Sequence, residues 1–264
     1  MSKGRPELDH LLDFAVRIAR EAGDITLRYF RQTRLSADLK ADGSFVTTAD
    51  REAERHLRAR IENAFPHDAI LGEEEGTRAG TSGRLWIIDP LDGTYTFVHG
   101  VPLYGVLIGV EIEGEPSVGV INIPAGDELL CAARGRGCYW NNKPAHTSST
   151  PTLDKALLLA TDFGTCEQYG YGQAAEELQR RAAARRTWGD CYGHVLVATG
   201  RADCMLDPVM NTWDCAALLP IIEEAGGTFT DWKGERTIRG GSALSTNKLL
   251  FNEAMGIIQD NRRG

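Results

Sequence analysis

The segment WIIDPLDGT, residues 86–94, decides the fold, because an apolar strand runs directly into two carboxylates. Its first three residues are typical of a buried strand, and Pro90 is expected to end the hydrogen-bond ladder of that strand. Gly93 permits a tight turn, after which a helix can begin with its free N–H groups facing the same place. Asp89 and Asp92 should therefore emerge together at the strand end, where carboxylates and backbone donors suit a metal-bridged phosphate.

Taken alone, this string equally fits an acidic turn followed by a helix cap. Two further acidic elements favour the metal site. Glu73 lies in LGEEEG, residues 71–76, where a predicted strand enters a loop. Asp214 follows the capping residue Asn211 in the first turn of an apolar helix, where the helix dipole alone would also favour an acid. Asp50, in TTAD at residues 47–50, belongs to a further acidic cluster of this kind. Several acidic clusters at the ends of elements are harder to explain by helix capping alone.

Together these elements resemble the inositol-monophosphatase superfamily of magnesium-dependent phosphomonoesterases, and they occur in the family's order over nearly the whole chain. The resemblance rests on GEE at 72–74, DPLDGT at 89–94, WD at 213–214 and EAGG at 224–227. It implies an α+β fold, a layered α/β/α/β/α sandwich, and Mg²⁺ as cofactor, with roughly two or three ions per site. The metal ligands that it implies are Glu73, Asp89, the backbone carbonyl of Leu91, Asp92 and Asp214.

The chemistry of a phosphate monoester agrees with this ligand set. A catalyst must neutralise the phosphate oxygens, present the attacking water and stabilise the leaving alkoxide, and clustered Mg²⁺ ions can do all three. The resemblance assigns a main ion to Glu73, Asp89 and Asp92. It assigns a second ion, near the leaving group, to Asp89, Asp92 and Asp214. Because cations offset the repulsion between clustered acids, removal of the metal should let these carboxylates bind protons more readily.

The attacking water is the next assignment that the resemblance carries. Asp50 and Thr94 occupy the positions of the family's Asp–Thr pair, which together with Glu73 would orient or deprotonate the water. The backbone amides of Gly93 and Thr94 would bind phosphate. No covalent phosphoenzyme is expected, because the cysteines and histidines show no nucleophile–base spacing. Histidine is also not expected among the ligands, since Mg²⁺ prefers oxygen.

The segment RRTWGDCYGH, residues 185–194, narrows the substrate. The inositol-specific branch carries small neutral or hydroxylated residues where this chain has Asp190, and Asp207 lies where the family contacts the alcohol. Two carboxylates beside an alcohol pocket favour a cationic leaving group such as that of histidinol phosphate. The chain therefore resembles the histidinol-phosphatase branch, which acts in histidine biosynthesis. The expected substrate contacts are Asp92, Arg186, Gly189, Asp190, Cys191, Asp207 and Asn211.

Alternatives remain at this stage. Asp190 also fits a turn or N-cap residue before a short helix at 191–198. The enzyme could instead be an inositol-1-phosphate or general sugar-alcohol monophosphatase, because the neighbouring branches share the catalytic frame. From a different class, the chain could be a regulatory member of the family that binds a macromolecule.

Composition limits the partners and the compartment. The 264 residues are 42% hydrophobic, enough for a substantial core, and the formal charge of −8 disfavours a nucleic-acid partner. Six cysteines without a C-x-x-C pair, and the lack of an apolar run of membrane length, indicate a reduced cytoplasmic protein that does not enter a membrane. The resemblance implies a homodimer that acts on a small-molecule phosphate monoester.

Hydrophobic periodicity predicts the elements of the first half. Helical spacing of apolar residues indicates helices over 7–31 and about 48–65. Three alternating segments at 106–112, 117–123 and 129–133 are separated by Gly- and Pro-containing turns and predict an antiparallel meander.

The polar stretch TSSTP at 147–151 is the predicted boundary between two intimate halves of one phosphatase domain that spans residues 1–264. The halves are about 1–150, of α+β type, and 151–264, of α/β type, and the site should lie between them. The elements predicted in the second half are strands at 156–161, 202–206, 228–230 and 243–245, and helices at 173–185, 191–198, 213–225 and from 247 onward.

Overall fold

The outer face of the first half is a pair of helices. The structure, a computed structural model, describes residues 5–32, 37–39 and 45–261. Helix α1 (Arg5–Tyr29) buries its apolar stripe against the neighbouring sheet, and α2 (Thr48–Ala64) packs beside it. Both helices lie close to their predicted ranges. Helix α2 begins at a capping box, because the Thr47 hydroxyl accepts the N–H of Ala49 and the Asp50 carboxylate accepts the N–H of Thr47.

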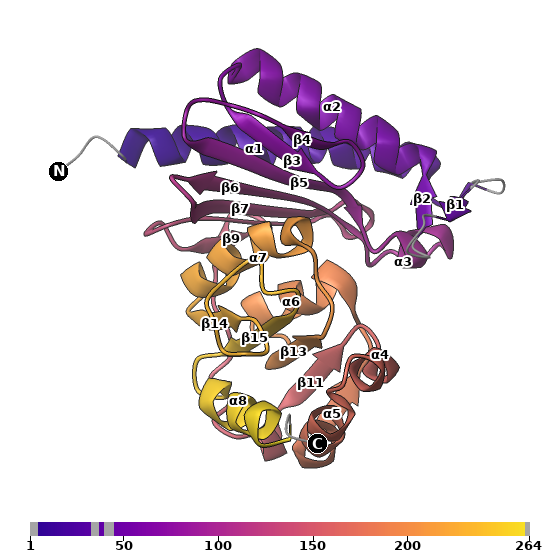
Figure 1. Cartoon of the computed structure of the whole chain (residues 1–264), viewed down its shortest axis with the longest axis vertical. Helices are drawn as coiled ribbons and strands as arrows, with labels where there is room; N and C mark the ends of the chain where they lie inside the picture. Colours follow the sequence, from indigo (N-terminus) through magenta and orange to yellow (C-terminus); the bar gives the residue numbers. More distant parts are fainter. Residues whose placement is uncertain (1–4, 33–36, 40–44, 262–264) are drawn as a thin grey trace.

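Beneath these helices lies an eight-stranded sheet (Figure 1). The three predicted strands of the meander are adjacent and antiparallel in it, which confirms that prediction. The third and fifth strands of the chain run parallel to each other, so the segments that follow them start from the same edge. In spatial order the strands are β10 (Lys143–Ala145), β9 (Cys138–Trp140), β8 (Glu128–Ala133), β7 (Glu115–Ile123), β6 (Gly105–Ile112), β5 (Arg84–Asp92), β3 (Ala69–Gly72) and β4 (Gly76–Arg78).

The opposite face of this sheet is covered by α6 (Asp190–Ala198) and α7 (Thr212–Glu224). The side chains of β5 alternate between its two faces, so that Trp86 and Ile88 pack toward α1 and α2 while Ile87 packs toward α7. Helix α7 approaches the sheet closely at Gly109, where an added Cβ would lie 2.5 Å from the Ala216 Cβ. This close contact fixes where the N-terminus of α7 lies relative to β5.

A five-stranded sheet and three helices complete the layers (Figure 1). The sheet has the order β12 (Ala184–Arg186), β11 (Leu157–Ala160), β13 (Cys204–Asp207), β15 (Ala243–Asn247) and β14 (Gly227–Thr230). The outer helices are α4 (Phe163–Gln168), α5 (Gly172–Arg181) and α8 (Phe251–Asp260). The predicted layered α/β/α/β/α class is therefore confirmed. Short elements elsewhere are β1 (Ala37–Leu39), β2 (Phe45–Thr47), α3 (Thr94–Val98), η1 (Pro124–Gly126) and η2 (Leu153–Lys155).

One apolar core joins the two halves of the chain. It contains Ile87 and Leu107 of the large sheet together with Val195 of α6, Leu218 of α7 and Met205 of the smaller sheet, all buried. The two further large clusters lie under α1 and α2 and under the outer helices. The boundary at 147–151 stays a prediction. Among the described residues, no helix combines the length and the apolar character that crossing a membrane requires.

Three local predictions were wrong. Pro90 does not end the strand, because β5 continues to Asp92 through a register shift relative to β6 that places the proline in a bulge. The helix predicted over 173–185 ends at Arg181, and residues 184–186 form an edge strand parallel to β11. The last helix starts at Phe251 rather than at Asn247. The Asn247 side chain instead accepts the N–H groups of Leu249 and Leu250, just before the helix.

Candidate active site

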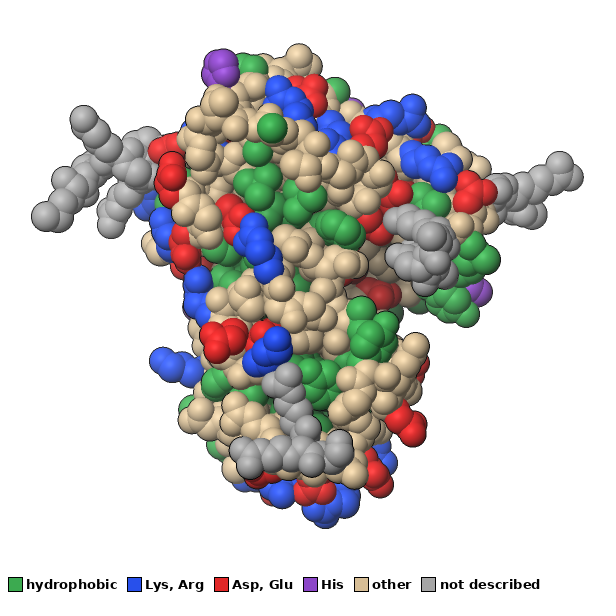
Figure 2. All heavy atoms as spheres, in the orientation of Figure 1, with side chains coloured by type: hydrophobic (Ala, Val, Ile, Leu, Met, Phe, Trp, Pro, Cys, Tyr) green, Lys and Arg blue, Asp and Glu red, His purple; other side chains and the backbone are tan. Residues whose placement is uncertain are grey.

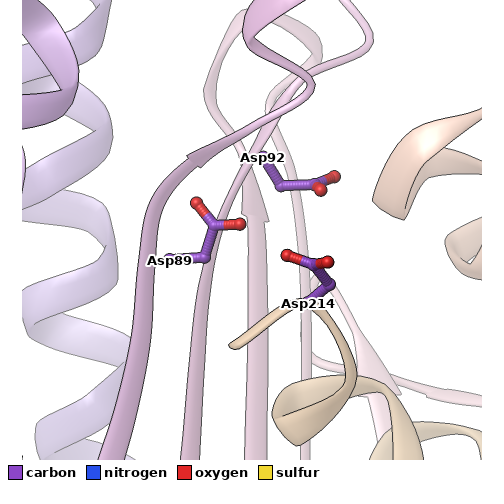
Figure 3. Close-up of side chains that lie close together, drawn as sticks. All are labelled: Asp89, Asp92 and Asp214. Carbon is purple, nitrogen blue, oxygen red and sulfur yellow. The ribbon is translucent and has the colours of Figure 1, made fainter. Parts of the chain in front are cut away.

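Three aspartates from two distant parts of the chain converge at the end of β5. Asp89 and Asp92 come from β5 and Asp214 from the first turn of α7, and one carboxylate oxygen of each lies within 4.8 Å of the others. Figure 3 shows the three side chains turned toward one another. The bulge in β5 makes this possible, since both of its acids face the same side of the strand end. The predicted convergence of these three residues is present.

Local hydrogen bonds orient two of these carboxylates. The backbone N–H of Leu91 donates to Asp89 Oδ1 at 2.9 Å. The backbone N–H of Asn211 donates to Asp214 Oδ2 at 2.6 Å, so Asp214 serves as the capping acid of α7 while also facing Asp89. Capping and convergence are therefore compatible roles of the same side chain.

The electrostatics of the cluster favour a cation. Burial raises the pKa of Asp89 well above its usual value, and the charges of Glu73, Asp92 and Asp214 raise it further. Burial likewise raises the pKa of Asp92, with the charges of Asp190 and Asp214 adding to it. Burial raises the pKa of Asp214 to about 7, although the bond from its N-cap opposes the shift. A divalent cation would offset this repulsion, and a donor set made of carboxylate oxygens fits a hard ion such as Mg²⁺.

Glu73 lies directly after β3, the parallel neighbour of β5. Its N–H donates to the carbonyl of Ile88 at 3.3 Å, and its side chain lines a cavity of about 210 Å³ together with Asp89, Asp92 and Asp214. Its carboxylate is not one of the three within 4.8 Å of one another. Glu73 therefore lines the same cavity as the three aspartates without belonging to their close group.

The predicted Asp–Thr pair is in contact. Thr94 Oγ1 lies 3.2 Å from Asp50 Oδ1 and 3.1 Å from the carbonyl oxygen of Leu91, so the hydroxyl can donate to either. The other oxygen of Asp50 accepts both the N–H and the hydroxyl of Thr47, at 2.8 and 2.6 Å. Asp50 is fully buried, and this burial raises its pKa despite the bonds from Thr47. The carboxylate therefore binds a proton more readily than an exposed aspartate would.

Gly93 joins the end of β5 to the short helix α3. Its φ of 82° lies in the left-handed region, and a Cβ there would lie 2.9 Å from Asp190 Oδ2. Both the backbone conformation and the close approach of Asp190 therefore require glycine. Thr96, one turn into α3, donates its hydroxyl to the same Asp190 oxygen at 2.9 Å.

A second cavity, of about 150 Å³, adjoins the first and shares Asp92, Asp190 and Asp214 with it. Asp207 also lines it, and its Oδ2 lies 3.0 Å from Nε2 of the buried His194. Burial raises the pKa of Asp190 to about 6; the bond from Thr96 lowers it and the charge of Asp207 raises it. The two predicted substrate acids thus face one cavity beside the aspartate cluster.

Asp190 itself has an uncommon backbone conformation. Its φ is 51°, and the residue before it, Gly189, is the N-cap of α6. The Asp190 N–H donates to the Thr161 hydroxyl at 2.9 Å, and a Cβ on Gly189 would lie 2.3 Å from the Thr161 Cα. The alternative of Asp190 as the N-cap of this helix is therefore wrong, because Gly189 holds that position, and Asp190 lines the cavity instead.

The remaining predicted substrate contacts differ in location. Cys191 is buried and donates its N–H to Asp92 Oδ2 at 2.6 Å, and burial raises the pKa of its thiol well above the usual value. Asn211 is exposed beside Asp214. Arg186 is exposed on β12 and is not among the residues that line either cavity. Of the predicted substrate contacts, Asp92, Asp190 and Asp207 therefore line the second cavity. Gly189, Cys191 and Asn211 adjoin or contact a lining residue without lining either cavity themselves.

Sequence reasoning missed several residues of this region. Thr161 and Asp162 follow β11 and line the second cavity, and Thr96 holds Asp190. A polar pair directly after a strand was the available signal for the first two. Glu54 and Arg58 of α2 were also missed, although the four-residue intervals from Asp50 to Glu54 and from Glu54 to Arg58 place all three on one helical face.

Known proteins match this chain in sequence and in structure over nearly its full length. The model of the inositol monophosphatase family matches residues 7–262. The chain is 43% identical over 245 residues to a histidinol-phosphatase of Chlorobaculum parvum, with 93% of each chain covered. It is 36% identical over 249 residues to a histidinol-phosphatase of Mycobacterium tuberculosis, covering 92% of this chain and 96% of that protein. An extragenic suppressor protein suhB from Bartonella henselae has a similar structure, with a TM-score of 0.88 at 27% identity, covering 95% of this chain and 98% of that one.

Proposed function

Because the chain belongs to the inositol monophosphatase family, we propose that it is a Mg²⁺-dependent phosphomonoesterase that hydrolyses histidinol phosphate to histidinol and phosphate. The observation that carries this proposal is the convergence of Asp89, Asp92 and Asp214 beside a cavity that two more acids, Asp190 and Asp207, line. The first group suits cations that bind a phosphate, and the second suits a positively charged alcohol.

The cation ligands would be the carboxylates of Glu73, Asp89, Asp92 and Asp214 with the carbonyl of Leu91, holding roughly two or three Mg²⁺ ions. We assign the main ion to Glu73, Asp89 and Asp92, and a second ion to the three aspartates. Bound Mg²⁺ would neutralise phosphate oxygens and lower the pKa of a coordinated water.

The residues around this cluster supply orientation and a proton acceptor. The Thr94 hydroxyl donates toward Asp50, which leaves the lone pairs of its oxygen to accept a hydrogen bond from the attacking water. As the water attacks, its proton can pass to Thr94 while the Thr94 proton passes to Asp50. The bonds from Thr47 hold Asp50 in place during this transfer. The N–H groups of Gly93 and Thr94 would contact the phosphate, and Glu73 would help to orient the water.

Recognition of the alcohol rests on the two acids of the second cavity. Among the contacts of the described residues, Thr96 and His194 engage only Oδ2 of Asp190 and of Asp207 respectively. The second oxygen of each carboxylate can therefore accept from the ammonium or imidazole N–H groups of histidinol phosphate. Gly189, Cys191 and Asn211 would support the wall of this pocket, whereas Arg186, which lines neither cavity, would meet a substrate only outside it.

The first test is a substrate panel measured at saturating Mg²⁺. It compares phosphate release from histidinol phosphate, inositol 1-phosphate, fructose 1,6-bisphosphate and a bisphosphonucleotide. We expect the highest kcat/KM on histidinol phosphate. A preference for inositol 1-phosphate would assign the chain to a sugar-alcohol branch. Negligible turnover on all four esters, with a stoichiometric partner in a pull-down, would favour the regulatory alternative.

The second test addresses the cationic substrate. Asp190→Asn should lower kcat/KM for histidinol phosphate by about 10- to 100-fold, because a charge-assisted bond is lost, and should change the value for inositol 1-phosphate much less. The matched control is Asp162→Asn, which alters an acid in the same cavity whose oxygens are engaged at the start of α4, by the Gly164 N–H and the Thr165 hydroxyl. Equal losses on both substrates in Asp190→Asn would remove the argument for cation recognition.

The setting of the enzyme follows from the same resemblance. We propose that it acts as a homodimer in the cytoplasm on a small-molecule ester, without a nucleic-acid partner. The net charge of −8 supports the last point, because it opposes binding to a phosphate backbone. Sedimentation of the purified protein would test the dimer.

A further inference from the structure

One face of α2 carries three buried charged residues, Asp50, Glu54 and Arg58. Their four-residue spacing places them in a row along the helix. Asp50 contacts Thr94 at the site, whereas Glu54 and Arg58 have no part in the chemistry described so far. A buried carboxylate and a buried guanidinium are tolerated only when their hydrogen bonds are satisfied, so the partners of this pair show what it holds.

The partners of Glu54 are the backbone of the turn that follows β3. The N–H of Glu74 donates to Glu54 Oε2 at 2.7 Å, and the N–H of Glu75 donates to Oε1 at 2.9 Å. Arg58 Nε donates to the same Oε1 at 2.8 Å, and Arg58 Nη2 donates to the carbonyl of Gly76. The pair on α2 therefore binds the backbone of Glu74 and Glu75 in this turn and of Gly76, the first residue of β4.

The chain on the other side of Glu73 also contacts Glu54. A Cβ on Gly72 would lie 2.2 Å from Glu54 Oε1, so the carboxylate is seated directly against the last residue of β3. The N–H of Glu73 itself donates to the carbonyl of Ile88, the residue before Asp89. Glu54 therefore contacts the residues on both sides of Glu73, namely Gly72 and Glu74. The backbone of Glu73 itself is hydrogen-bonded to β5.

We propose that Glu54, assisted by Arg58, is a positioning residue that holds the Glu73 carboxylate toward the Asp89, Asp92 and Asp214 cluster. The inference rests on the proposed function in that it takes Glu73 as a cation ligand. Side chains that orient metal ligands commonly change metal affinity when they are altered. One face of α2 would then position both the Asp50–Thr94 pair and the carboxylate of Glu73.

The test compares two buried carboxylates at opposite ends of β3. Glu54→Gln keeps the shape of the side chain but places an NH₂ group against an N–H or guanidinium donor. The control Asp68→Asn does the same at the start of β3, where Asp68 is fully buried and pairs with Arg84 away from the cluster. Mn²⁺ binding to each metal-free protein is measured by electron paramagnetic resonance, alongside thermal unfolding.

We expect Glu54→Gln to weaken Mn²⁺ binding by about tenfold and to raise the Mg²⁺ concentration for half-maximal activity by a similar factor. Its KM for histidinol phosphate at saturating Mg²⁺ should stay within about twofold, because the second cavity is untouched. Asp68→Asn should lose stability but bind Mn²⁺ as the wild type does. If Glu54→Gln does not fold, Arg58→Lys serves in its place, since it keeps the charge but loses the planar fork, with an expected weakening of about threefold.

Unchanged Mn²⁺ binding in Glu54→Gln, or in Arg58→Lys where that variant replaces it, would overturn the positioning role. Equal weakening in Asp68→Asn would overturn it too, because loss of general stability would then explain the effect. Failure of the wild-type protein to bind Mn²⁺ at all would instead contradict the proposed metal-dependent function. The two proposals therefore fail on different measurements.

Discussion

Two buried aspartates, one just before β3 and one on the neighbouring strand β5, have opposite surroundings. Asp68, just before β3, is fully buried and accepts hydrogen bonds from Arg84, Ser82 and Trp86. Burial alone would raise its pKa, but these bonds outweigh that effect and the pKa is lowered. Asp89, on β5, is 1% exposed and faces other acids, so burial and those charges both raise its pKa.

The difference shows how this fold uses buried charge. Where a carboxylate only stabilises the chain, the sequence supplies its cation and donors from within, as Arg84 does for Asp68. At the end of β5, Asp89, Asp92 and Asp214 face each other, and no Lys or Arg of the described residues forms an ion pair with them. A bound divalent ion would supply the positive charge that these acids need. The cluster should therefore lower the stability of the metal-free fold and raise that of the metal-bound fold.

The largest expected effect comes from removing one acid of the cluster. Asp92→Asn should lower kcat by on the order of a thousandfold, because a metal ligand that stabilises the transition state is lost. In metal-free buffer the same variant should unfold at a temperature equal to or above that of the wild type, since one repelling charge is gone. Steady-state kinetics and calorimetry measure the two effects. Activity near that of the wild type would contradict the metal assignment.

The opposite variant should have the opposite pattern. Asp68→Asn should destabilise the fold by about 2 kcal/mol, because an amide cannot satisfy all the donors that face this side chain. At saturating Mg²⁺ its kcat should stay within about twofold of the wild type. Denaturant unfolding and phosphate release measure both quantities. A loss of activity as large as that of Asp92→Asn would mean that the two regions are not separate in function.

The smallest expected effect is a dependence of metal stabilisation on pH. The pKa of Asp214 is raised from 3.8 to about 7 in the fold, so the metal-free folded state binds this proton more tightly than the unfolded chain does. The resulting stability is complete below about pH 4 and is lost as the pH rises through 7. Because Mg²⁺ binds the ionised cluster, the increase in Tm that it causes should be larger at pH 8 than at pH 5.5, by at least about 3 °C.

Thermal unfolding with Mg²⁺ or with chelator at both pH values measures this difference. Asp214→Asn is its control, since the variant lacks the group whose titration is invoked and should show a smaller change with pH. An equal Mg²⁺ effect at both pH values in the wild-type protein would argue against proton and metal competing for the same carboxylates.

Much of the fold could be predicted because the relevant signals are local. Alternation in the three strands of the meander and helical spacing in α1 and α2 indicate their elements directly. Pro90 misled because its effect depends on the bulge between Asp89 and Asp92, which only pairing with β6 creates. Residues 184–186 misled because arginines favour a helix, whereas hydrogen bonds to β11 hold them as an edge strand.

The predictability of the site follows the same division. Asp89 and Asp92 share a short motif, so their proximity is visible in the sequence. The contact of Thr96 with Asp190 joins residues 94 positions apart, and no local pattern announces it. In the sequence, Glu54 looks like any acidic residue of an amphipathic helix. Its role becomes visible only in the fold, where the N–H groups of Glu74 and Glu75 donate to it.

The central claim is that carboxylates far apart in the sequence form one divalent-cation site beside the ester. Anomalous diffraction from crystals soaked in Mn²⁺ tests it most directly. The account predicts an anomalous peak among Asp89, Asp92 and Asp214, with a bound ion also within coordination distance of the Glu73 carboxylate. Mn²⁺ bound only elsewhere, or no peak here under conditions in which the enzyme is active with Mn²⁺, would contradict it.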